Sequence, residues 1–127
     1  EVQNMNEKDI ELYEKIQAQL KGLYEEISIL SKKSPNDGLN KFKLKFVNQI
    51  LVSLNLLLGK KYKPFSDFEV FSEDELPTNA DVVFILSQYL SCMEKMRADN
   101  IDQNMGLWYW SANGKPTDIR TSPPQKI

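Results

Sequence analysis

The chain of 127 residues contains no histidine, a single cysteine and only two arginines. Without histidine, the most common general base and the most common metal ligand are both missing. Ser-His-Asp and Cys-His catalytic groups are therefore excluded, as are zinc sites built from cysteine and histidine. Cys92 cannot form an internal disulfide, which is typical of a reducing compartment. We expect no catalytic, metal or cofactor residues, no enzymatic activity, and a cytoplasmic location.

The chain also lacks a long apolar run and a strong charge of either sign. No stretch approaches the 18 consecutive apolar residues that indicate a membrane span, so we expect no membrane association. The net charge of −2 predicts no general affinity for nucleic acid. The hydrophobic fraction of 41% is ordinary for one globular domain, and residues 1–127 are interpreted as one domain. Residues 1–4 are interpreted as an addition before a natural start at Met5.

Apolar residues at helical spacing fill the first quarter of the chain. Six of them are separated by three or four residues in alternation, which is a heptad pattern: Tyr13, Ile16, Leu20, Leu23, Ile27 and Leu30. The pattern covers about two and a half heptads, so it favours a bundle helix over a coiled-coil rod. It predicts a first helix over residues 5–33, which the turn-forming residues 34–38 end.

Two further helices are predicted, over residues 39–60 and 79–101. In the second helix, lysine and apolar residues alternate over six positions as in a strand, but helical spacing covers the whole segment. The buried stripe predicted for it consists of Phe42, Phe46, Ile50, Leu54 and Leu57, widened by Val47, Leu51 and Leu58. Gly59 is placed as its C-cap. The apolar connection, residues 61–78, is expected to lie across the helices. Its Ser72–Glu75 segment has the form of a capping box and predicts one short helical turn.

The C-terminal region predicts a β-hairpin over residues 107–120, followed by an extended tail over 121–127. Asn113-Gly114 is the strongest short hairpin signal, because a type I′ turn needs a positive φ at both positions. This turn pairs Ala112 with Lys115, Ser111 with Pro116, Trp110 with Thr117 and Trp108 with Ile119. Both tryptophans then share one face. That face either packs on the helices of this chain, contacts a partner protein, or stacks on bases.

Two sets of residues are therefore candidates for binding. The first is aromatic and basic, as protein interfaces tend to be, and consists of Trp108, Tyr109, Trp110 and Arg120. The second is lysine-rich and suits phosphate groups, and consists of Lys41, Lys45, Lys60, Lys61 and Lys63. The scarcity of arginine, which is preferred for base and phosphate recognition, weakens the second interpretation.

Together these patterns predict a mainly all-α fold. We expect an antiparallel three-helix bundle with one short extra helical turn and a C-terminal β-hairpin. The function that we expect is that of a small adaptor or regulatory protein, which binds another protein or a second copy of itself as an oligomer. The alternative is a nucleic-acid-associated protein that uses the lysines of the second helix. The richness in Lys and Asn and poverty in Arg is typical of an AT-rich bacterial genome.

Overall fold

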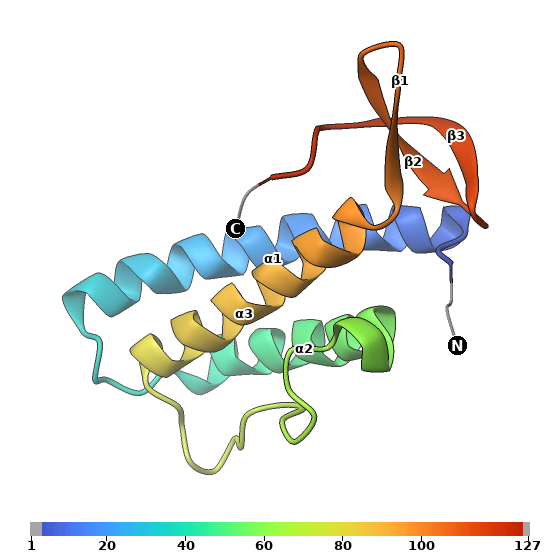
Figure 1. Cartoon of the computed structure of the whole chain (residues 1–127). Helices are drawn as coiled ribbons and strands as arrows, with labels where there is room; N and C mark the ends of the chain where they lie inside the picture. Colours follow the sequence, from blue (N-terminus) through green and yellow to red (C-terminus); the bar gives the residue numbers. More distant parts are fainter. Residues whose placement is uncertain (1–3, 126–127) are drawn as a thin grey trace.

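The computed structural model describes residues 4–125, which form three helices and a three-stranded antiparallel sheet (Figure 1). In chain order the elements are α1 (Glu7–Lys33), α2 (Lys41–Tyr62), α3 (Asn79–Ala98), β1 (Ile101–Asn104), β2 (Leu107–Ala112) and β3 (Lys115–Thr121). The sheet, in the order β1-β2-β3, lies over the beginning of α1 and the end of α3 (Figure 1). The fold is thus mixed α and β, and the prediction of an all-α fold was wrong.

The direction of the helices also differs from the predicted antiparallel bundle. The beginnings of α2 and α3 are adjacent, because Gly38 and Thr78 form an isolated β-bridge. Their ends are adjacent too, because the Tyr62 hydroxyl donates a hydrogen bond to Asp99. Hence α2 and α3 run in the same direction, and α1 runs opposite to both (Figure 1). The connection of residues 63–78 allows this arrangement, since it can reach about 50 Å and α2 is only about 33 Å long.

Each helix begins at a side chain that accepts a backbone N–H from the first turn. Asn6, Asn40 and Thr78 are the three N-cap residues. Asn6 forms a full capping box with Asp9, in which each side chain accepts from the backbone of the other. Such caps satisfy N–H groups that have no partner inside the helix, and each contributes about 1 kcal/mol. The start predicted for α3 is therefore confirmed, whereas α1 begins two residues later than predicted.

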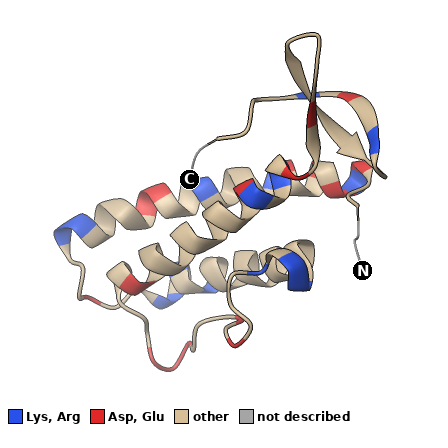
Figure 2. Cartoon of the chain, in the orientation of Figure 1, with Lys and Arg blue, Asp and Glu red and all other residues tan. Residues whose placement is uncertain are grey.

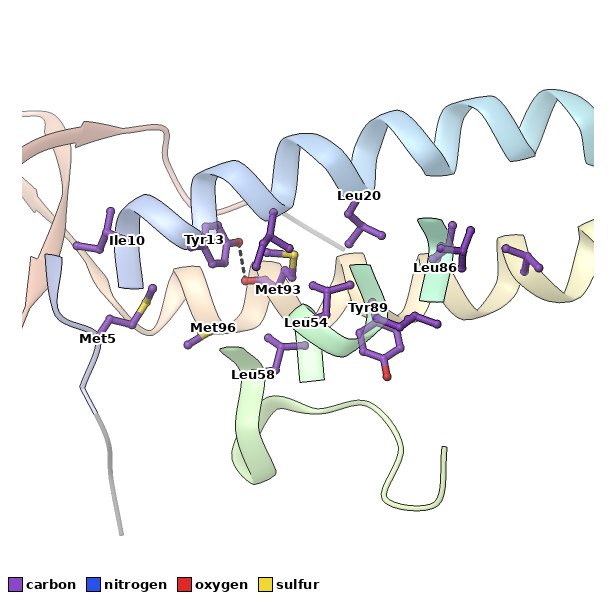
Figure 3. Packing of buried hydrophobic residues seen from close by; sticks show 14 of the residues in the cluster. Met5, Ile10, Tyr13, Leu20, Leu54, Leu58, Leu86, Tyr89, Met93 and Met96 are labelled. Atoms are coloured by element: carbon purple, nitrogen blue, oxygen red, sulfur yellow. Dashed lines mark hydrogen bonds between the residues drawn. The ribbon is translucent and has the colours of Figure 1, made fainter. Parts of the chain in front are cut away.

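The core lies where the three helices meet, and the heptad pattern predicted for α1 faces it (Figure 3). Tyr13 is fully buried, and its hydroxyl donates a 2.7 Å hydrogen bond to the backbone oxygen of Met93. Burial raises the pKa of Tyr13 well above its ordinary value. The buried residues of α1 and α3 include Ile10, Tyr13, Ile16, Leu20, Ile27, Val82, Leu86, Tyr89, Met93 and Met96.

The buried face predicted for α2 was wrong at its N-terminal half. Phe42 is 71% exposed and Phe46 is 41% exposed, although both were expected in the core. The core face of α2 consists of Leu44, Val47, Asn48, Leu51, Leu54 and Leu58, of which all but Leu44 and Asn48 were predicted. The first half of α2 carries apolar residues on adjacent faces, so periodicity alone does not select one of them. The buried face is the one that packs with α1 and α3 in the core, and beside it the Lys43 ammonium lies 2.6 Å from the Glu26 carboxylate of α1.

The connection between α2 and α3 contains no helical turn, although Ser72–Glu75 predicted one. The Ser72 hydroxyl does accept the N–H groups of Asp74 and Glu75, so the capping geometry is present. No helix follows, because Pro77 disfavours the helical conformation of the residue before it. The connection is instead fixed to α2 by Asn48, whose amide donates to and accepts from the backbone of Phe71, both at 3.0 Å. The connection thus packs on the helices, as expected, but it lies along α2 and not across all three helices.

The sheet contains one strand more than the predicted hairpin, because α3 ends at Ala98 and β1 follows. The turn at Asn113-Gly114 is confirmed, with a positive φ at both residues, and Ala112 pairs with Lys115 as predicted. Beyond Ser111 the register shifts, so that Trp108 pairs with Thr121 and not with Ile119. The cause lies in a bulge, where the Thr117 hydroxyl donates to the Trp110 oxygen and accepts from the Ile119 N–H.

Candidate interaction surfaces

The two tryptophans of the sheet face the helices of the same chain. Trp110 is only 1% exposed, and its ring meets the Tyr13 ring edge-on at a centroid distance of 5.0 Å. Trp108 and Ile119 are half-buried against the same core. The face that they share with Trp110 therefore packs on this chain, which is the first of the three interpretations that the sequence left open. Trp110 offers no surface to a partner in this arrangement.

The other two candidates, Tyr109 and Arg120, lie on the outer side of the sheet. They are paired across β2 and β3, and the Arg120 guanidinium lies 5.7 Å from the centroid of the Tyr109 ring. A cation over an aromatic face is attracted by about 0.5–1 kcal/mol at an exposed site. The four aromatic and basic candidates thus divide between two faces of the sheet, and they form no single contact surface.

The five candidate lysines divide between the two ends of α2 (Figure 2). Lys41 and Lys45 lie in its first two turns and are exposed. The other three lie about 25 Å further along the helix, where Lys63 forms an ion pair with Glu69 and Lys61 lies over the Tyr62 ring. This separation leaves no single basic patch of the kind that tracks a nucleic-acid backbone.

The C-terminal ends of α2 and α3 are joined by one strong hydrogen bond. The Tyr62 hydroxyl donates to a carboxylate oxygen of Asp99 over 2.6 Å, and Lys95 lies 3.1 Å from the other oxygen. The hydrogen bond from Tyr62 lowers the pKa of Asp99, and Lys95 and Lys61 lower it further. In return, burial and the bond to Asp99 raise the pKa of Tyr62 to about 12. Each group therefore favours the charge state that keeps the bond.

We expect the variant Tyr62→Phe to raise the pKa of Asp99 toward its ordinary value. A carboxyl with a lowered pKa stabilises the fold above its unfolded-state pKa, and this contribution disappears as the pH falls through the folded-state pKa. The free energy of unfolding should therefore differ between wild type and variant at about pH 7 more than at about pH 2. An NMR titration of Asp99 and urea unfolding at both pH values measure this. If the pKa of Asp99 is the same in the variant as in wild type, Lys95 and not Tyr62 lowers it.

The three helices form three grooves, and segments of the chain lie over two of them. The connection lies in the groove between α2 and α3, where Asn55 donates to the oxygen of Glu69 and accepts from the Tyr89 hydroxyl. The sheet and the tail lie over the groove between α1 and α3, where Arg97 holds the tail (Figure 1). In the third groove, between α1 and α2, the structure describes no covering segment.

This third groove is hollowed and apolar. Its volume is about 440 Å³, and it is lined by Ala18, Gln19, Gly22, Leu23, Phe46, Gln49, Ile50 and Ser53. Gly22 has no neighbouring atom within 4 Å of the position that a Cβ would take, so the floor beside α1 is open. Phe42 extends the groove, because its ring meets that of Phe46 at 5.0 Å.

Leu56, which is 81% exposed, and Leu12 of α1 line a second hollow further along the same two helices. We call the groove with Leu12, Phe42 and Leu56 the open face. The outward residues of α2 are separated by four, three, four and three positions, which is a second heptad line beside the buried one: Phe42, Phe46, Gln49, Ser53 and Leu56. This spacing is the sequence signal for the open face. The predicted buried stripe included Phe42 and Phe46 and therefore did not separate the two lines.

In comparisons with protein-family models, with curated proteins and with solved structures, this chain matches none. Within residues 4–125, α2 is the one helix that is long and apolar enough to cross a membrane, judged by length and composition alone. In this fold its inner side is part of the core. Interpretation of the protein therefore rests on its own residues and their arrangement.

Proposed function

We propose that the protein is a small cytoplasmic adaptor or regulatory protein, without catalytic activity of its own, which binds a partner protein through the open face. The observation that carries this proposal is that segments of the chain lie over two of the three helix grooves, whereas the third exposes large apolar side chains. Soluble proteins seldom expose large contiguous apolar patches, and such patches tend to mark interaction sites. An apolar groove between two helices suits a third helix, which would lay its apolar side along it.

The charge around the open face indicates what kind of helix would fit. Between Leu39 and Ser66 the sequence contains lysines and no acidic residue. Lys41 and Lys45 flank the phenylalanines, and among residues 4–125 neither forms an ion pair. Lys60 follows beyond Leu56. Complementary charges speed encounter and fix orientation. The partner that we propose is therefore an amphipathic helix with acidic residues beside its apolar side.

A designed helical peptide of about 20 residues tests the proposal, with leucine along one side and glutamate beside it. We expect the wild-type protein to bind it, and the variant Phe42→Ser with Leu56→Ser to bind it at least tenfold more weakly, since buried anchors dominate interfaces. Titration calorimetry measures both affinities. Both side chains are mostly exposed, so the variant should keep the helical circular dichroism signal. The matched control is Phe84→Ser, which removes an exposed aromatic from α3 and should leave binding unchanged.

Three outcomes would contradict the proposal. One is equal affinity for a peptide with lysine in place of glutamate, which would remove the role of charge. Another is a wild-type dimer in light scattering that dissociates in the Phe42→Ser, Leu56→Ser variant, which would make a second copy the occupant. The third is binding to vesicles of anionic lipid without binding to the peptide, which would make the open face a membrane surface.

The alternative function, binding of nucleic acid, has less support. Its five lysines lie at two ends of one helix, and Lys63 is paired with Glu69. The aromatic side chains that would stack on bases lie partly in the core, with Trp110 fully so.

A further inference from the structure

The C-terminal tail is held by a buried ion pair on α3. Glu94 and Arg97 are 7% and 4% exposed, and two nitrogens of the guanidinium each lie 2.9 Å from a different oxygen of the carboxylate. The other guanidinium N–H groups donate to the Thr121 hydroxyl and to the backbone oxygens of Ser122 and Pro123, at 2.7–2.9 Å. All five N–H donors of Arg97 are thereby used.

Glu94 completes the contact with the tail. One of its oxygens accepts the backbone N–H of Gln125 over 2.8 Å. The tail side chains from Ser122 to Gln125 are exposed. Apart from the Thr121 hydroxyl, the ion pair therefore recognises the backbone of the tail and not its side chains.

The positions of the recognised groups fit two consecutive prolines. The pair binds the oxygens of Ser122 and Pro123 and then the N–H of Gln125. Between these groups lie Pro123 and Pro124, which have no N–H that would need an acceptor. Prolines also favour the extended conformation before binding, which lowers the entropy lost on docking. Two prolines therefore leave Gln125 as the first residue after Ser122 whose N–H needs an acceptor, and Glu94 supplies it.

We propose that this α3 surface is a docking site for an extended peptide with two consecutive prolines, and that the chain's own residues 121–125 occupy it as an intramolecular competitor. A Pro-Pro segment of another protein would bind there by displacing the tail. Beside the tail lies a cleft of about 510 Å³ between α1 and α3, with Gln17, Lys21, Tyr24, Leu90 and Ser91 in its lining. The cleft gives room for a peptide longer than the tail segment. This site is separate from the open face.

A labelled peptide with the sequence of residues 119–127 tests the proposal on the full chain. The wild-type tail competes at the high effective concentration of a tethered segment. Two variants weaken the binding of the tail to α3. One is the double substitution Pro123→Gly with Pro124→Gly, and the other is Gln125→Pro, which removes the N–H that Glu94 accepts. We expect both variants to bind the peptide at least tenfold more tightly than wild type, measured by fluorescence anisotropy. A peptide with Gly-Gly in place of Pro-Pro should bind both variants at least tenfold more weakly than the original peptide does.

A second measurement uses the wild-type chain alone. Excess peptide should speed the hydrogen exchange of the Gln125 amide, because the displaced tail loses its bond to Glu94. Failure of the peptide to bind either variant, while the Gln125 amide of the Pro123→Gly, Pro124→Gly variant exchanges freely, would overturn the proposal. So would equal binding of the Gly-Gly peptide. Neither result bears on the open face, which the Phe42→Ser, Leu56→Ser variant tests.

Discussion

The variant Trp110→Ala should lower the free energy of unfolding by about 3–5 kcal/mol, the range for removing a buried large aromatic side chain. Trp110 is 1% exposed and packs edge-on against Tyr13, so its loss would leave a cavity between the sheet and α1. Folded domains are typically stable by about 5–15 kcal/mol, so the variant would be close to unfolding at room temperature. Urea unfolding followed by circular dichroism measures the loss.

The control for this result is Trp110→Phe. The indole N–H of Trp110 has no hydrogen-bond partner among residues 4–125. Phenylalanine keeps an aromatic ring and removes this unsatisfied donor, so it should cost much less than alanine. If Trp110→Ala instead unfolded at the wild-type urea concentration and lost binding to a partner, the ring would belong to an interface and not to the core.

The second large effect is expected for Arg97→Met. Removing the guanidinium leaves the Glu94 carboxylate buried without its cation, and breaking a buried ion pair on one side typically costs about 3–5 kcal/mol. The variant also removes the donors to the tail at Thr121, Ser122 and Pro123. We therefore expect lower stability in urea together with fast hydrogen exchange in residues 121–125.

A double variant separates the buried charge from the lost contacts. Glu94→Leu combined with Arg97→Met removes both charges, so no uncompensated carboxylate remains. It should be more stable than Arg97→Met alone, while the tail stays released. A double variant less stable than the single one would mean that the Glu94 carboxylate without its cation does not destabilise the fold. Both outcomes are read from the same urea curves and exchange rates.

The elements that the sequence predicted well are those fixed by local chemistry. Four of the six heptad residues of α1 are buried and the other two, Leu23 and Leu30, are partly buried, and α3 begins at the predicted residue 79. Gly59 has a positive φ, as its C-cap placement required, although α2 continues to Tyr62 and its C-cap is Lys63. The Asn113-Gly114 turn has the predicted conformation. Each of these signals depends on residues within one or two helical turns, and the fold does not override them.

The strand β1 was missed because its signal is weak. Ile101–Asn104 contains one buried residue and three exposed ones, so the alternation of a half-buried strand is barely present. Its turn places Met105 at a φ of 52°, a conformation that methionine seldom adopts. Such a strand forms only because β2 is already held on α1 by Trp110 and offers it a partner.

The sequence by itself determined the positions of the three helices and of the hairpin to within three residues, and which familiar chemistries are excluded. The tertiary structure decided which side of α2 is buried, that α2 and α3 run in parallel, and that Glu94, Arg97 and the tail meet. The physical reason is that these choices depend on contacts between residues far apart in the chain. A helix that is apolar on two adjacent sides has no local preference between them, and only its neighbours select the side that remains exposed.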